Sequence, residues 1–179
     1  TVVADGDQSD FGNLADQSLE SLLNIEVTSV SRQAQKLGDS PAAIFVLTRE
    51  DIKRSGAYTI PDALRLVPGL RVAMIDANKW VVTSRGFSDR FVNKMLVQID
   101  GRSVYTPLFS GVWWDVQDLV LEDIDRIEVI RGPGATMWGA NAVNGIINII
   151  TKQAFETQGL LVSARAQTED RNVGELRYG

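Results

Sequence analysis

The clearest hydrophobic pattern in the chain lies between residues 41 and 152, where short apolar runs alternate with polar turns. The run AAIFVLT is typical of a buried strand. Two short helices are predicted after it. Thr48 can cap the stretch REDIKRSG, which Gly56 ends, and Thr59 can cap a second helix that Pro68-Gly69 stops.

Further extended segments follow these helices. They are residues 70–73, 81–85, 94–99, 102–105, 124–130 and 146–151. The dipeptide Asp100-Gly101 predicts a hairpin turn between two of them. Asp118 is expected to start a helical turn. A mixture of short strands and short helices of this kind indicates an α+β fold.

The two ends of the chain have a different character. Residues 1–25 begin as an acidic, aperiodic stretch and then offer Ser18 as the cap of a short helix, which together predict a flexible N-terminal extension. From Leu160 to Ala166 apolar residues alternate with mostly polar ones, and a second strand is expected near 175–178. A membrane-barrel strand shows this alternation, and so does a half-buried strand of a soluble protein.

Composition excludes several kinds of chemistry. The 179 residues include no His and no Cys, so imidazole catalysis and Cys/His zinc sites are excluded. The net charge is −5, and no basic cluster suggests nucleic-acid binding. We therefore expect neither an enzyme nor a bound cofactor or metal.

The stretch RGPGATMWGANAVNGIINIITK, residues 131–152, is rich in glycine and resembles a phosphate-binding loop at first sight. Its glycines do not follow the G-x-G-x-x-G spacing, because Met137 occupies the third glycine position, and the lysine of a Walker loop is absent. The glycines instead predict a sharp turn and a close backbone approach that lets the following strand enter a crowded sheet.

Three stretches, in order along the chain, resemble the plug domain of TonB-dependent outer-membrane receptors. They are SPAAIFVLTREDIKRSGAYTIPDALRLVPGL (40–70), SRGF (84–87) with VQIDGRSVY (97–105), and the glycine-rich stretch through Lys152. The resemblance covers residues 26–152. It implies a plug built on a small mixed four-stranded sheet with short helices, lodged inside a β-barrel. Residues 1–25 would then be an extension, and residues 153–179 the start of the barrel, its first one or two strands, cut off at Gly179.

The resemblance also implies a TonB box, the segment gripped by the energy-transducing periplasmic protein TonB. The matching residues are Ile25, Glu26, Val27, Thr28, Ser29, Val30 and Ser31. β-Branched residues on an extended tether suit addition to the sheet edge of a partner. The segment can equally be a plain edge strand of the plug. The stretch TVVA at residues 1–4 is another candidate box, although its distance from Pro41 fits less well.

Two arginines, Arg85 and Arg131, resemble the pair that holds the family's plug against barrel glutamates. The alternative is that both are solvated surface residues. Ligand contacts are expected from two outward loops, residues 76–80 and 106–114. The candidate ligand-binding residues are Asn78, Lys79, Trp80, Leu108, Phe109 and Trp113. Aromatics in these loops can bind a flat chelate or pack against the barrel wall.

The function that this resemblance implies is the gate of an active importer in the outer membrane, with its N-terminus in the periplasm. Its expected partners are TonB, its own β-barrel and a small-molecule ligand, an iron–siderophore or another metal chelate. A periplasmic or surface binding module that uses the same fold without transport is the alternative. The two differ in whether a long series of alternating strands follows the plug.

Overall fold

The computed structural model describes the greater part of the chain, including all the strands of the predicted sheet. The described residues are 26–27, 35–36, 43–76, 79–84, 94–109, 111–132, 138, 142–166 and 172–179. The predicted extension, residues 1–25, lies outside these ranges, as does the helix expected from Ser18.

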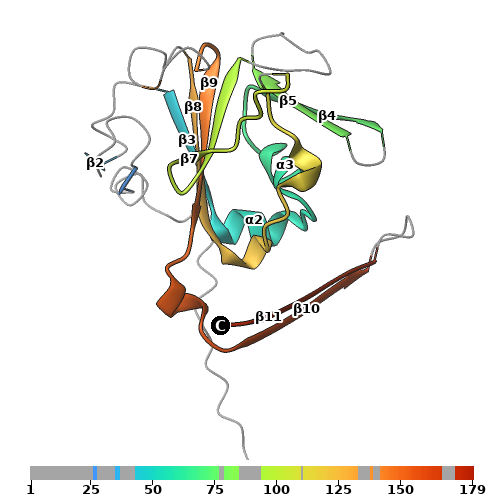
Figure 1. Ribbon diagram of the computed structural model, residues 1–179. Helices are drawn as coiled ribbons and strands as arrows, with labels where there is room; N and C mark the ends of the chain where they lie inside the picture. The colour runs from blue at the N-terminus through green and yellow to red at the C-terminus, as the bar shows by residue number, and fades with distance from the viewer. Residues whose placement is uncertain are drawn as a thin grey trace, which may run out of the picture.

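The centre of the fold is a mixed sheet with the strand order β3-β8-β9-β6-β7 (Figure 1). Its strands are β3 (Ala43–Thr48), β8 (Ile124–Arg131), β9 (Gly145–Thr151), β6 (Met95–Ile99) and the two-residue β7 (Arg102–Ser103). β9 runs parallel to β6, and the other neighbouring strands are antiparallel. The predicted α+β fold with a small mixed sheet is confirmed, with β7 added at one edge of the four longer strands.

Helices α2 (Arg49–Ser55) and α3 (Ile60–Leu64) begin where the sequence predicts. The Thr48 hydroxyl accepts a hydrogen bond from the Asp51 amide, and the Asp51 carboxylate accepts one from the Thr48 amide at 3.0 Å. Gly56 ends α2 with a left-handed φ of 66°. None of the helices in the described part of the chain has the length and apolarity to cross a bilayer.

Two local predictions need correction. Helix α3 ends at Leu64, before Pro68-Gly69, because the chain continues in tighter turns in which the Val67 amide donates to the Leu64 carbonyl. Asp118 does not start a helical turn. The short 3₁₀ turns are instead η2 (Trp114–Val116) and η3 (Leu121–Asp123), whose Trp114 and Leu121 are buried in the core.

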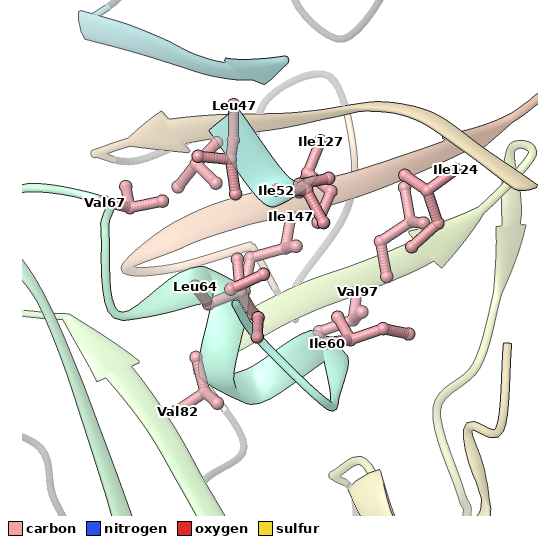
Figure 2. Close-up of a cluster of buried hydrophobic side chains, with 14 of the residues drawn as sticks. Leu47, Ile52, Ile60, Leu64, Val67, Val82, Val97, Ile124, Ile127 and Ile147 are labelled. Atoms are coloured by element: carbon pink, nitrogen blue, oxygen red, sulfur yellow. The ribbon is translucent and has the colours of Figure 1, made fainter. Parts of the chain in front are cut away.

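The core lies between one face of the sheet and helices α2 and α3, which cover that face (Figure 1). Because side chains alternate along a strand, every second residue of each strand points to the helices. Figure 2 shows the resulting cluster. Its labelled members are Leu47, Ile52, Ile60, Leu64, Val67, Val82, Val97, Ile124, Ile127 and Ile147. Each of these side chains is at most 4% exposed.

Three antiparallel pairs complete the described structure. They are β4 (Leu70–Asp76) with β5 (Lys79–Ser84), β10 (Leu160–Ala166) with β11 (Asn172–Tyr178), and β1 (Glu26–Val27) with β2 (Gln35–Lys36). The last pair contains Glu26 and Val27 of the predicted TonB box. A short 3₁₀ turn, η4 (Ala154–Thr157), leads from the sheet to β10.

The β10–β11 hairpin has one apolar and one polar face, as the alternation from Leu160 to Ala166 predicts. Leu160 is paired with Tyr178, and Val162 with Leu176. Each of these four side chains is at least 67% exposed. The strand predicted at 175–178 is confirmed and begins earlier, at Asn172. That this hairpin opens a barrel, with a domain boundary at residue 153, remains a prediction.

Gly145 shows why the glycine-rich stretch precedes β9. A Cβ atom at this position would lie 2.4 Å from the carbonyl oxygen of Ile130 and 3.3 Å from Cε of Met95. Real Cβ atoms do not approach a backbone oxygen so closely, so a side chain here would push β9 away from β8. The predicted close backbone approach is confirmed at this glycine.

Gly145→Ala is therefore expected to lower the free energy of unfolding by about 1–3 kcal/mol, the usual cost of overpacking. Urea titration followed by circular dichroism would measure the loss. Gly174→Ala in β11 is the matched control, because a Cβ there meets nothing within 4 Å. Equal stability of the two variants would contradict the steric role of Gly145.

Candidate functional site

The two predicted ligand loops meet in one aromatic groove beside the β4–β5 hairpin. Its walls are Trp80 of β5 together with Phe109, Val112, Trp113 and Trp114. The rings of Phe109 and Trp113 pack edge to face, with centroids 4.8 Å apart and planes at 77°. The structure thus brings together four of the predicted ligand-binding residues, which are Lys79, Trp80, Phe109 and Trp113.

The loop that carries Phe109 is closed by its own backbone. The Thr106 amide donates to the Gly111 carbonyl at 2.8 Å, and the Thr106 hydroxyl accepts a hydrogen bond from the Leu108 amide at 3.3 Å. This closure leaves Leu108 at the tip, where its side chain is 82% exposed. Leu108 therefore lies outside the groove that Phe109 and Trp113 line.

Lys79 and Trp80 lie in a strand and not in a loop, which corrects the prediction for residues 76–80. Strand pairing extends almost to the hairpin tip, with Met74 opposite Trp80 and, beyond a bulge, Asp76 opposite Lys79. The Lys79 ammonium forms an ion pair with Asp76 at 3.0 Å. The Arg65 guanidinium lies 5.2 Å from the centre of the Trp80 ring. Asn78 lies outside the described residues.

The neighbouring residues Trp113 and Trp114 lie in different surroundings. Trp114 is 8% exposed and belongs to the hydrophobic core, so it packs inside the domain. Trp113 is half-buried beside Phe109 in the groove and stays accessible to a ligand or to another surface. The sequence carried no signal that distinguishes these neighbours, because their burial depends on the η2 turn that begins at Trp114.

The groove contains two small cavities, each of about 20 Å³. A volume of this size holds about one water molecule, whereas a pocket for a drug-sized ligand needs at least about 300 Å³. Within the described ranges, no three acidic side chains are placed to hold a metal ion either. The groove by itself is therefore too small to enclose a drug-sized ligand.

Arg131, one of the two predicted docking residues, is held by a turn of its own domain. Its Nη1 donates to the Pro68 carbonyl at 3.0 Å, and its side chain lies against Gly69. Its Nε is buried and has no hydrogen-bond partner. The guanidinium thus keeps donor capacity beyond its contact with Pro68. Arg85 lies outside the described residues, so the predicted arginine pair remains a prediction.

The predicted TonB box is described at two residues, Glu26 and Val27, which pair with Lys36 and Gln35. Val27 is fully buried. The remaining five box residues lie outside the described ranges. They are Ile25, Thr28, Ser29, Val30 and Ser31.

The hairpin β10–β11 contacts the central domain through charged groups at η3. The Arg177 guanidinium lies 3.1 Å from the Asp123 carboxylate, and the Ser163 hydroxyl lies 3.5 Å from Glu122.

Lys152 donates to the Glu122 carbonyl at 2.6 Å. Burial lowers the pKa of Lys152, and the neighbouring Arg49 lowers it further, while Asp123 acts in the opposite direction. Lys152 therefore loses its proton more readily in the folded chain than in the unfolded chain. Because the unfolded chain then holds more protons, the titration of Lys152 raises the free energy of unfolding as the pH rises.

Comparison with known proteins identifies the domain. A family model described as the TonB-dependent Receptor Plug Domain matches residues 36–146, which is more than half of the chain. The chain belongs to the TonB-dependent receptor plug family. The matched range contains β3, β8 and β6 of the central sheet, the start of β9, both helices and the aromatic groove. It begins after the predicted TonB box.

Similar proteins are outer-membrane transporters and receptors. The vitamin B12 transporter BtuB of Vibrio cholerae is 32% identical over 152 residues, which are 85% of this chain and 23% of that protein. An iron-regulated outer membrane virulence protein of V. cholerae is 33% identical over 132 residues, which are 71% of this chain and 20% of that protein. The plug thus spans about a quarter or less of the length of these relatives.

Among solved structures, the pyoverdine outer membrane receptor FpvA of Pseudomonas aeruginosa PAO1, bound to pyoverdine, matches 84% of this chain and 21% of that receptor. The TM-score is 0.66 and the identity 25%. The fold of the alcaligin receptor FauA of Bordetella pertussis is also similar, with a TM-score of 0.57 at 22% identity over 72% of this chain and 21% of that receptor. The plug is therefore a component of the outer membrane.

The small volume of the groove leads to a prediction about the 179-residue chain. The chain by itself is expected to fold and to bind a ferric siderophore or vitamin B12 more weakly than micromolar, because the cavities of the aromatic groove are too small to enclose either compound. Isothermal titration calorimetry with each compound would measure this. A dissociation constant of one micromolar or tighter would show that the plug forms a complete pocket.

Proposed function

We propose that this plug is the gate of an active importer of a scarce nutrient in the outer membrane. The observation that carries the proposal is the match of the plug family to residues 36–146, which hold most of the central sheet and the groove. Transporters and receptors among the similar proteins support it. In this proposal the remaining part of the receptor forms a β-barrel around the plug, and the β10–β11 hairpin supplies its first strands, with lipid against Leu160 and Val162.

The ligand that we propose is a metal chelate, most simply a ferric siderophore. One similar protein is named for vitamin B12 and another structure contains pyoverdine. On the plug, the rings of Phe109 and Trp113 lie near the ion pair Lys79–Asp76, a combination that suits a large ligand with ring systems and charged groups.

Growth of a receptor-deletion strain on a panel of iron and cobalt chelates tests the proposal. Complementation with the full-length receptor should restore growth on one chelate. If no chelate distinguishes the deletion from the complemented strain, while the receptor still binds a partner at the surface, the plug would be part of a binding module without transport.

The proposed energy source is TonB, which would bind residues 25–31 by strand addition. Val27→Pro should abolish energised uptake and leave ligand binding at the cell surface intact, because proline removes an amide donor from the added strand. Val27→Ile is the control and should transport normally. Uptake of labelled ligand by the proline variant at the wild-type rate would rule out this segment as the TonB box.

We propose further that Arg85 and Arg131 hold the plug against carboxylates of the barrel wall. Removing one side of a buried ion pair costs about 3–5 kcal/mol, whereas an exposed pair is worth less than about 1 kcal/mol. The Arg85→Ala/Arg131→Ala receptor should therefore admit large antibiotics and show a plug that unfolds at a lower temperature than the wild-type plug.

The matched control for this pair is Arg54→Ala/Arg102→Ala, which removes two exposed arginines from α2 and β7. Antibiotic sensitivity and calorimetry of the purified receptor give the two readouts. If both double variants behave like the wild type, the two arginines are surface groups and do not seat the plug.

A further inference from the structure

The central sheet has a second face, opposite the helices, whose composition changes from row to row. Pairing places Ile44, Ile130, Ile146 and Leu96 side by side across β3, β8, β9 and β6. The last three of these are buried in a small hydrophobic cluster of their own. Two residues further along the strands, the same register places Glu128, Asn148 and Gln98 side by side. An apolar row is therefore followed by a polar row on one face.

The polar row, Glu128–Asn148–Gln98, is as deeply buried as the apolar one. The exposed fractions are 0% for Glu128, 6% for Asn148 and 7% for Gln98. Arg126 lies on the same face, and its Nε donates to the Glu128 carboxylate at 2.9 Å. In contrast, Oε1 of Gln98 and Oδ1 of Asn148 are buried and accept no hydrogen bond. Buried acceptors without donors are rare and costly, so these two amide oxygens lack a partner.

A cavity of about 770 Å³ lies over Gln98 and Asn148 of this row. Its described lining includes Gln98 and Asn148, three carboxylates and one guanidinium. The carboxylates are Asp100, Asp125 and Glu156, and the guanidinium is that of Arg126. Asp125 is paired with Arg126, and Asp100 accepts hydrogen bonds from the amide and hydroxyl of Thr151. The described lining thus has a formal charge of −2 and two unused acceptors, which favours a cationic hydrogen-bond donor.

The β10–β11 hairpin indicates where such a donor can come from. Its Arg177 already presents a guanidinium to Asp123 at the edge of the central domain. If the hairpin begins the barrel, as the proposed function states, further strands of the wall also turn their polar face to the plug. The similar V. cholerae transporter is more than four times as long as the stretch matched here, so most wall strands lie beyond this chain.

We propose that the polar row on the open sheet face is a second docking surface of the plug, occupied in the full receptor by a basic side chain of the barrel wall. Gln98 and Asn148 accept its hydrogen bonds, and the surrounding carboxylates match its charge. The polarity is opposite to that of Arg131, where the plug supplies the cation. The inference rests on the proposed function, because it requires a wall around the plug.

Two substitutions of Gln98 in the full-length receptor test this docking surface. Gln98→Leu removes the acceptor, whereas Gln98→Glu keeps the shape and adds a negative charge. With a basic partner, amide hydrogen exchange in β6 and β9 should become about tenfold faster in the Leu variant, the effect of losing one charge-assisted hydrogen bond. The same amides should exchange more slowly than wild type in the Glu variant.

The control is the same pair of substitutions at Gln158, an exposed glutamine that does not line the cavity. Both control variants should exchange like the wild type. Should either Gln98 variant fail to fold, Asn148→Leu and Asn148→Asp on the neighbouring strand carry the same two expectations.

The outcomes separate the docking surface from the proposed function. Unchanged exchange in the Leu variant would mean that water satisfies these acceptors, and faster exchange in both variants would mean that no cation is bound. Either result, in a receptor that inserts into the outer membrane and imports its ligand, overturns the docking surface alone. A wild-type receptor that neither inserts nor imports overturns the proposed function, and the docking surface with it.

Discussion

The packing of β9 between β8 and β6 is the contact on which the rest of the plug depends. β9 hydrogen-bonds to one neighbour in antiparallel and to the other in parallel orientation, so it links chain segments that are far apart in sequence. Gly145 permits this packing at the start of the strand, where the Ile130 carbonyl leaves no space for a side chain. The pairing of Gly145 with Arg131 also fixes the end of β8 beside the Pro68-Gly69 turn. One close backbone contact thus positions both the core and the candidate docking arginine.

The two faces of the sheet have different requirements. The face toward α2 and α3 is covered by a continuous apolar core and needs no further partner. The opposite face combines a small apolar cluster with the polar row of Glu128, Asn148 and Gln98. The buried oxygens of Gln98 and Asn148 accept no hydrogen bond on this face, and they are the basis of the proposed second docking surface.

The aromatic groove is also too small to form a complete binding site by itself. Trp80, Phe109 and Trp113 form one aromatic wall, but the cavities between them are too small for a metal chelate. The aromatic groove and the polar row thus have the same property, because each leaves groups that another surface could contact. If a barrel wall completes both surfaces, as we propose, the free energy of ligand binding depends on plug and wall together and is coupled to the position of the plug.

The sequence by itself determined the local structure and the family. Helix caps at Thr48 and Thr59, the turn at Asp100-Gly101 and the strands of the sheet follow from interactions between residues close in the chain, so they could be predicted. The motifs between residues 40 and 152 were sufficient to indicate a plug. The alternation from Leu160 to Ala166 likewise predicted a two-faced strand, because side-chain direction in a strand repeats every two residues.

The tertiary structure decided which residues share a surface. Trp113 and Trp114 are identical neighbours in sequence, yet one lies in the groove and the other in the core, because the η2 turn directs them differently. Lys79 and Trp80 proved to be paired strand residues, since strand pairing depends on a partner that local sequence does not specify. Gln98, Glu128 and Asn148 lie on three strands separated by up to 50 residues. Their alignment into one buried polar row results from the register of β8, β9 and β6, a property of long-range hydrogen bonding that local residue patterns do not determine.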